Sequence, residues 1–358
     1  MNQNAISLSG RIFGGGSPPL IIAELSGNHG QSLETALKLV ELAAHAGADA
    51  IKLQTYTADT MTLNCDRDDF RISDPKSLWY RRNLYELYNE AHTPWHWHEP
   101  LFDRAQELGM LAFSSAFDRS AVDFLDKLNV PCIKIASFEV NDIPLIQHAA
   151  STGRTLMIST GMASIEDIEL ALRTVDRAGG AVPVLLKCTS HYPADARHAN
   201  LNSMLDMRSR FDVPVGLSDH SLGIGVAVAA TALGCCVIEK HLVLSRKSET
   251  VDAAFSMEPA ELRVLTEECR RASLGLGEVQ YGPVDPTMDP YEHRRSIYVA
   301  KDIAAGERLT ESNLKVIRPG HGLPPRHLAE VLGATARRAL PFGTALSWED
   351  IESEHDST

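Results

Sequence analysis

The chain has 358 residues, of which 44% are hydrophobic and 23% charged, and its formal net charge is −13. This composition is ordinary for a globular protein, and the acidic balance argues against a nucleic-acid-binding protein, which needs a basic surface. The start, MNQNAISLSGR, does not have the pattern of a signal peptide, and the longest weakly polar run (223–238) is too short to span a membrane.

A short apolar segment followed by an amphipathic helix recurs eight times along the chain. The predicted strands are 20–25, 50–56, 111–117, 132–137, 155–160, 182–190, 213–220 and 236–242. Most of them are nearly continuous apolar runs, as expected for parallel strands that are covered on both faces. Eight such units predict an α/β protein with a (β/α)8 TIM barrel. An open doubly wound sheet is the alternative, but the first strand is followed by SGNHGQS, which lacks a GxGxxG fingerprint.

The connection after the second strand is unusually long and rich in aromatic residues. About forty residues separate Tyr56 from the helix predicted near 97–109, far more than a usual βα loop. Such a segment at the active face of a barrel indicates a lid or a wall that contacts a sugar. The alternative is an extra helix over 77–91 that packs on the barrel by its aromatic side chains, and both interpretations can hold together.

The pattern changes after residue 280. Residues 281–292 include the Pro/Gly-rich sequence GPVDPTMDP and are predicted to be a linker. We therefore expect a catalytic barrel domain at 1–280 and a small C-terminal domain at 293–358. A domain of this size built from short strands buries little surface alone, so it is expected to dock on the barrel or on a partner subunit. The six cysteines are scattered without a disulfide or metal-binding pattern, which predicts a reduced, cytoplasmic protein.

Polar residues gather where the predicted strands end, and these ends meet at the active face of a barrel. Lysines and hydroxyls dominate the set, which suits a bound phosphate or carboxylate. Any one of these side chains could equally have a structural role, but burying several lysines without an anion is costly. The set includes Glu24, Lys52, Gln54, Ser115, Lys134, Ser137, Glu139, Ser159, Ser190, Tyr192, Asp219 and Lys240.

The seventh and eighth strands both end in an acidic residue and a histidine. VGLSDH ends at His220, and VIEKHL contains His241. Two neutral imidazoles on neighbouring strands suit a divalent metal such as Mn, Co or Zn. The alternative is a pair of hydrogen-bonded structural histidines, and the spacing gives the metal only a modest advantage.

Several stretches resemble the sialic acid synthase family over nearly the whole chain. They are IIAELSGNH, IKLQTYTADTMTL, FSSAFD, KIASFE, STGMAS, CTSHYP, GLSDHSLG, IEKHL and RPGHGLPP. The resemblance implies a barrel followed by an antifreeze-like (SAF) domain. Within the family, LYELYNEAHTPWHWHEPLF is similar to the pseudaminic acid synthase branch. That branch condenses phosphoenolpyruvate (PEP) with 2,4-diacetamido-2,4,6-trideoxy-L-altrose, giving pseudaminic acid and phosphate.

The resemblance also implies roles for individual residues. His220 and His241 would hold the metal, usually Mn or Mg, and Glu24 would position or activate the water that attacks PEP. The residues implied for PEP are Lys52, Ser115, Lys134, Ser137, Ser159, Ser190 and Ser218. Those implied for the sugar are Gln54, Glu139, Tyr192, Asp252 and Arg318. Arg318 would reach the site of the other subunit in a domain-swapped homodimer.

Three alternatives remain open at this point. The first is a synthase for another nonulosonate, such as legionaminate or N-acetylneuraminate. The second is a metal-dependent sugar isomerase or aldolase, which needs no PEP and releases no phosphate. The third is a non-catalytic glycan-binding protein. Fold alone does not decide among them.

Overall fold

The computed structural model describes residues 4–285, 287–289 and 291–352. The chain divides into two compact units, residues 1–277 and 278–358, and each is described by itself. Among the described residues, no helix is both long enough and apolar enough to cross a membrane.

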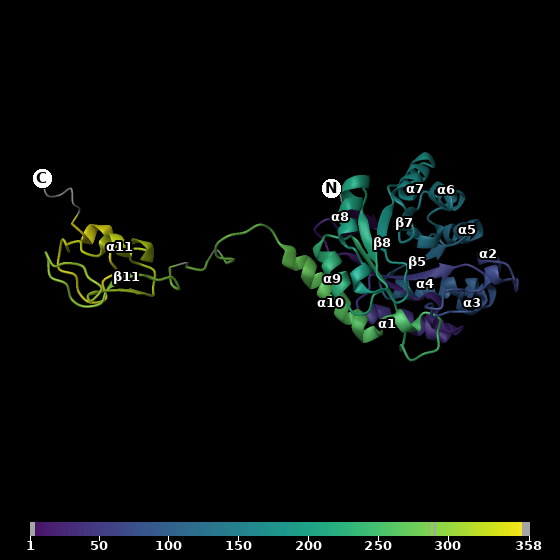
Figure 1. Cartoon of the computed structure of the whole chain (residues 1–358), viewed down its shortest axis with the longest axis horizontal. Helices are drawn as coiled ribbons and strands as arrows, with labels where there is room; N and C mark the ends of the chain where they lie inside the picture. Colours follow the sequence, from purple (N-terminus) through teal and green to yellow (C-terminus); the bar gives the residue numbers. More distant parts are fainter. Residues whose placement is uncertain (1–3, 286, 290, 353–358) are drawn as a thin grey trace. The chain divides into compact units, whose positions relative to one another are not determined.

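The first unit is the predicted barrel of eight parallel strands, closed in the order β10-β3-β4-β5-β6-β7-β8-β9 (Figure 1). Every predicted strand is present, with ends shifted by a few residues. The strands are β3 (Leu20–Glu24), β4 (Ala50–Thr55), β5 (Leu111–Ala116), β6 (Cys132–Ile135), β7 (Thr155–Ser159), β8 (Val184–Cys188), β9 (Val215–Ser218) and β10 (Val237–His241). Both faces of these strands are buried, which explains their continuous apolar sequences.

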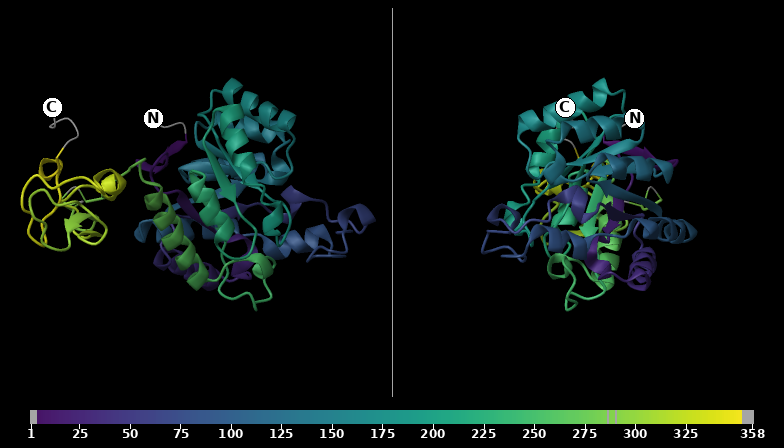
Figure 2. Two further views of the ribbon diagram at one scale, coloured as in Figure 1. Left: turned by 60° about the vertical axis from the view of Figure 1, so that its left-hand side comes forward. Right: turned by 90° about the vertical axis from the view of Figure 1, so that its right-hand side faces the viewer.

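Helices surround the barrel and cover the outward faces of the strands (Figures 1 and 2). They are α1 (Leu33–His45), α4 (His98–Glu107), α5 (Arg119–Lys127), α6 (Ile143–Ser151), α7 (Ile165–Arg177), α8 (Asn202–Phe211), α9 (Gly225–Ala232) and α10 (Pro259–Leu276), while α2 (Ala58–Met61) and α3 (Leu84–Ala91) belong to the long segment after β4. The 3-10 helices of this unit are η1 (Ser26–His29), η2 (Asp68–Phe70), η3 (Trp95–Trp97), η4 (Ser137–Glu139), η5 (Ala196–His198) and η6 (Ala253–Phe255), whereas η7 (Pro325–His327) and η8 (Trp348–Asp350) belong to the second unit. Side-chain caps begin several helices; Ser32, for example, accepts from the backbone N–H of Thr35.

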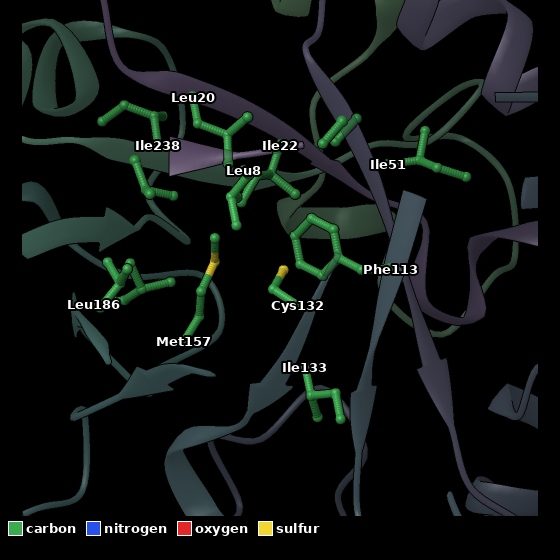
Figure 3. Packing of buried hydrophobic residues seen from close by; sticks show 14 of the residues in the cluster. Leu8, Leu20, Ile22, Ile51, Phe113, Cys132, Ile133, Met157, Leu186 and Ile238 are labelled. Carbon is green, nitrogen blue, oxygen red and sulfur yellow. The ribbon is translucent and has the colours of Figure 1, made fainter. Parts of the chain in front are cut away.

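Apolar side chains fill the inside of the barrel. Phe113, Cys132 and Met157 come from three neighbouring strands and point toward one another in Figure 3. All three are fully buried. A packed interior of this kind makes the barrel a rigid frame, so that side chains at the strand ends are held in fixed positions.

An N-terminal hairpin was not predicted from the sequence. Strands β1 (Ala5–Leu8) and β2 (Arg11–Gly14) pair antiparallel, and Leu8 and Phe13 join the barrel core. The side chain of Asn4 accepts from the backbone N–H of Val215, which begins β9. Because it bonds to the beginning of a barrel strand, the hairpin closes the end of the barrel remote from the strand C-termini.

The long segment after β4 stands out from the ring of helices in Figure 2. Its helix is shorter than the predicted 77–91, because α3 begins only at Leu84. The side chain of Asn83 caps α3 by accepting from the backbone N–H groups of Tyr85 and Glu86. Before the cap, Arg81 adopts a left-handed conformation with φ of 65°, which interrupts a helix.

The second unit is small and has its own apolar core. Strands β11 (Ser296–Val299) and β12 (Leu314–Ile317) pair antiparallel, and a short helix α11 (Leu328–Val331) follows. The buried core includes Ile297, Leu314 and Leu346. This unit therefore has an interior separate from that of the barrel.

Candidate active site

A polar layer follows the apolar interior at the C-terminal ends of the strands. Ser115, Lys134 and Ser159 each come two residues after an inward apolar side chain on β5, β6 and β7. Because strand side chains alternate between faces, these polar side chains also point into the barrel. The sequence thus changes from apolar to polar along the same inward face.

Lys52 lies at the centre of one half of this layer. Its Nζ donates to Ser115 Oγ at 2.9 Å and forms an ion pair with Glu24 at the end of β3. Glu239 Oε1 on β10 is 3.7 Å from the same Nζ. All four side chains are buried. Oε1 of Glu24 has no hydrogen-bond partner among the described residues.

Lys134 forms the other half of the layer. Its Nζ donates to Ser159 Oγ at 2.7 Å and lies 4.0 Å from Glu239 Oε1. Ser218 Oγ donates to the same carboxylate oxygen at 3.1 Å. Glu239 therefore joins the two lysines through one oxygen, while its Oε2 has no partner among the described residues.

Burial and neighbouring charges act against each other in this layer. Burial lowers the pKa of Lys52 to about 8, although Glu239 opposes the shift. Burial acts to raise the pKa of Glu239, but the two lysines outweigh it and hold this pKa below its usual value. Ammonium and hydroxyl donors gathered in a buried layer can bind a phosphate or carboxylate group.

Two further serines approach a glycine backbone beside this layer. The N–H of Gly161 donates to Ser137 Oγ at 3.2 Å. A Cβ at position 161 would collide with Ser190 Oγ, so only glycine permits this close approach. The two hydroxyls therefore converge beside one backbone turn.

His220 and His241 lie side by side, with ring centroids 5.2 Å apart. Nδ1 of His220 donates to the carbonyl oxygen of Thr189 at 3.2 Å, which leaves the Nε2 lone pair free to bind a ligand. Nδ1 of His241 lies 3.2 Å from Ser26 Oγ. Burial lowers the pKa of His241 well below its ordinary value, so its imidazole is neutral. Neutral imidazoles are the form that binds a divalent metal.

Cys188 at the end of β8 contacts this pair. Its Sγ lies 3.8 Å from His220 Nδ1. Burial acts to raise the pKa of Cys188, but His220 and neighbouring groups outweigh it and lower this pKa to about 7. Burial acts to lower the pKa of His220, but Cys188 and other neighbouring groups outweigh burial and raise this pKa. The thiol of Cys188 is therefore one of the groups that determine the pKa of His220.

Aromatic rings enclose the histidines. Tyr192 lies 4.6 Å from His220 and 5.1 Å from Phe255, measured between ring centroids. Phe255 also packs at 5.0 Å from His241. Asp252 Oδ2 is 3.8 Å from His241 Nδ1, and burial raises the pKa of Asp252 although Ser26 opposes the shift. The pair is therefore shielded from water on this side.

A cavity of about 570 Å³ opens beside the histidines. Six of the predicted site residues line it: Gln54, Glu139, Ser190, Tyr192, His241 and Asp252. The other predicted residues of the barrel are buried at its strand ends. Burial raises the pKa of Glu139 to about 7, and its Oε2 has no hydrogen-bond partner among the described residues. Arg318 is exposed in the second unit and is not among the residues that the barrel brings together.

Sequence reasoning overlooked several neighbours of the site. The sequence pattern shows Cys188 only as one of six scattered cysteines, and Phe255 carries no signal because it follows an irregular loop. Ser26 was missed although it lies within the IIAELSGNH motif. Lys240 and Asp219 were noted as polar residues, but their ion pair was not predicted. Each of them precedes a candidate histidine in the chain, and that shared spacing was the available signal.

The candidate metal centre consists of two protein side chains. Among the described residues, no group of three or more His, Cys, Asp or Glu side chains is arranged to hold a metal ion. His220 and His241 nevertheless fit a metal with an open coordination sphere, because both offer imidazole nitrogen donors and the adjoining cavity can admit further ligands.

Comparison with known proteins assigns the chain to a protein family. Residues 39–281 match the NeuB family, and residues 294–352 match the SAF domain. The chain belongs to the NeuB family. Its NeuB-family barrel carries the buried layer and the histidine pair, and the match to the SAF domain falls within the second compact unit.

Similar proteins cover nearly the whole chain. A pseudaminic acid synthase of Campylobacter jejuni is 42% identical over 332 residues, covering 93% of this chain and 96% of that protein. A pseudaminic acid synthase of Helicobacter pylori is 42% identical over 341 residues, with coverage of 94% and 98%. The crystal structure of an N-acetylneuraminic acid synthetase from Leptospira borgpetersenii, in complex with citrate, has a TM-score of 0.70 and 32% identity. It covers 78% of this chain and 92% of its own.

Proposed function

We propose that this NeuB-family protein is a pseudaminic acid synthase. It condenses PEP with 2,4-diacetamido-2,4,6-trideoxy-L-altrose and releases pseudaminic acid and phosphate. The observation that carries the proposal is one buried layer in which Glu24, two lysines and several hydroxyls adjoin a pair of histidines. The similarity to pseudaminic acid synthases over nearly the full chain supports the choice of product.

PEP would bind to the lysine and serine layer. Lys52 and Lys134 provide positive charge, and both already donate to serine hydroxyls that can turn toward an incoming phosphate or carboxylate. The complete set proposed for PEP is Lys52, Ser115, Lys134, Ser137, Ser159, Ser190 and Ser218. Charge-assisted hydrogen bonds of this kind also fix the orientation of the bound anion.

His220 and His241 would hold a divalent metal, with Mn, Mg and Co as candidates. When bound, such a metal supplies Lewis acidity toward the aldehyde of the sugar. The protein prepares the two donors by holding His241 neutral through burial and by orienting His220 through the Thr189 carbonyl.

The reaction forms a carbon–carbon bond and a carbon–oxygen bond to water, and it breaks the carbon–oxygen bond to phosphate. C3 of PEP bonds to the aldehyde carbon, whose oxygen takes up a proton. Water adds to C2 and loses a proton, and phosphate then leaves to give the ketone. Glu24 would position or activate this water, because its carboxylate is fully buried beside Lys52 and its Oε1 can accept a hydrogen bond.

The sugar would occupy the adjoining cavity, where Gln54, Glu139, Tyr192 and Asp252 provide polar contacts. The same proposal assigns residues 1–280 to the catalytic domain, 281–292 to a linker and 293–358 to the SAF domain. It also includes a cytoplasmic location and a domain-swapped homodimer, in which Arg318 of a second copy would reach the sugar.

Phosphate release tests this function. The protein is supplied with PEP and Mn²⁺ and with one sugar at a time, with and without EDTA. The panel contains the L-altro sugar, its diacetamido trideoxy stereoisomers and N-acetylmannosamine. Release with the L-altro sugar that EDTA abolishes supports the proposal. Release only with another sugar would assign the protein to a synthase with a different product. No release with any sugar would exclude a PEP-dependent synthase and would favour the sugar isomerase or the glycan-binding protein instead.

A further inference from the structure

The cavity beside His241 has an apolar part with no role in the chemistry above. Met61, Ile72, Leu84 and Leu87 line it, and we refer to these four side chains as the apolar wall. All four come from the segment between β4 and η3, whereas the polar lining residues Gln54 and Glu139 follow or end barrel strands. The inserted segment therefore contributes an apolar part of the cavity, beside its own Asp74 and Ser77 and opposite a barrel lining that includes both polar side chains and the aromatic residues Phe117 and Phe138.

The inserted segment is held in place by contacts on both sides of the cavity. Nε1 of Trp79 donates to the carbonyl oxygen of Val251 at 3.0 Å, and its ring packs 5.9 Å from Tyr192. Within the segment, the backbone N–H of Arg81 donates to the carbonyl of Ile72 at 2.9 Å. The side chain of Asn83 donates to the carbonyl of Cys65 at 2.9 Å. Because both the segment and its attachment are ordered by hydrogen bonds, the apolar wall is a preformed surface.

The apolar wall offers no hydrogen bonds to a ligand. A hydroxyl placed against it would lose its hydrogen bonds to water and gain none from the protein. A methyl group placed there would be removed from water, which is favourable in free energy. The polar lining has the opposite preference. Glu139 has a buried carboxylate oxygen with no protein partner among the described residues, and it can accept an N–H or O–H from a ligand. The cavity thus favours a molecule that carries methyl groups in one part and hydrogen-bond donors in another.

We propose that the apolar wall is the specificity determinant that selects a deoxygenated, N-acylated sugar by receiving its methyl groups. This inference rests on the proposed function. His241 lines the same cavity. A sugar whose aldehyde lies near the histidines therefore extends its remaining carbons along the other residues that line the cavity. N-acetylmannosamine carries a hydroxymethyl group where the trideoxy sugar has its C6 methyl, and a hydroxyl where the trideoxy sugar has its methyl-bearing 4-acetamido group.

The test replaces wall residues with polar residues of similar size. Met61→Gln and Ile72→Thr are chosen because both residues are only partly buried, so the chain tolerates the change better than at Leu87. Leu63→Gln and Leu78→Gln are matched controls in the same segment, because these side chains are 66% and 47% exposed and do not line the cavity.

KM for the trideoxy sugar should rise about tenfold in each wall variant, the amount that a lost apolar contact contributes to selectivity. The kcat with this sugar and KM for PEP should stay within a factor of about two. Calorimetric titration of the sugar should show a matching loss of affinity. Turnover of N-acetylmannosamine relative to the trideoxy sugar should increase, and both control variants should behave as the wild type does.

The outcomes separate this inference from the proposed function. If the wild type turns over the trideoxy sugar and the folded wall variants keep its KM and affinity, the apolar wall is not the determinant and the proposed function stands. Equal effects in the wall and control variants also overturn the inference. If the wild type neither binds the trideoxy sugar nor releases phosphate with any sugar of the panel, both fail.

Discussion

Lys240 Nζ lies 2.9 Å from Asp219 Oδ2, and each of these two residues immediately precedes one of the candidate histidines. Both side chains are buried. Nζ also donates to the carbonyl oxygens of Ser221 and Gly223 in the loop after β9. Because side chains alternate along extended backbone, Lys240 of β10 and Asp219, which directly follows β9, lie on the outer face while the histidines point to the inner face. The ion pair therefore fixes the two strand ends relative to each other.

Lys240→Met should destabilise the protein strongly. It leaves the Asp219 carboxylate buried without its cation, and breaking a buried pair in this way costs about 3–5 kcal/mol. Urea unfolding at neutral pH measures the change. The double variant Lys240→Met/Asp219→Asn should recover part of the loss, since it removes the unpaired charge. Equal stability of Lys240→Met and the wild type would contradict a fixing role for the pair.

Lys134→Met should raise KM for PEP by about 10- to 100-fold, because a hydrogen bond to a charged group contributes about 1.5–3 kcal/mol. Steady-state phosphate release at saturating sugar measures this effect. Lys187→Met is the matched control, because Lys187 is also a strand lysine but donates to the carbonyl of Cys188 rather than to the serine layer. A larger effect at Lys187 than at Lys134 would contradict the assignment of the layer to PEP.

Glu139 should make stability fall as the pH rises from about 4.5 to about 7. Burial raises its pKa from 4.5 to about 7 in the folded chain, so the folded chain holds a proton in this window that the unfolded chain has released. The contribution is at most about 3 kcal/mol. Unfolding free energies of the wild type and Glu139→Gln, measured without metal or substrates, should diverge across this window. Parallel pH profiles would show that the carboxyl titrates normally.

Trp79→Phe should loosen the inserted segment while it keeps an aromatic ring. The change removes the hydrogen bond to the Val251 carbonyl, which contributes about 0.5–1.5 kcal/mol. Amide hydrogen exchange over residues 62–83 should become faster, and KM for the sugar should rise a few-fold. Trp348→Phe, in the second unit, is the control. Unchanged exchange in the Trp79 variant would mean that other contacts hold the segment.

The sequence was sufficient to predict the barrel because its strands are continuous apolar runs that end in polar residues. Phe113 and Ser115 illustrate this, since a spacing of two residues assigns both to one face. The same rule placed the lysines and histidines at one end of the barrel. The position of Arg318 relative to the barrel could not be obtained in this way, because the residue belongs to a separate unit.

Other features depend on contacts that no local pattern encodes. The hairpin formed by β1 and β2 is short and lies before the first repeated unit, so only its packing of Leu8 into the core reveals its role. The start of α3 depends on the side chain of Asn83 and on the backbone of Arg81. The apolar wall comes from residues far apart in the segment, such as Met61 and Leu87, that meet only in the folded chain.

Identification of the product formed from PEP and the L-altro sugar tests the central claim most directly. Purified protein with Mn²⁺ is incubated with both substrates, and the mixture is analysed by mass spectrometry, NMR and phosphate determination. The account predicts a nine-carbon 2-keto acid with the configuration of pseudaminic acid, formed together with one equivalent of phosphate. Unchanged PEP and sugar, or an isomerised sugar without phosphate release, would contradict it.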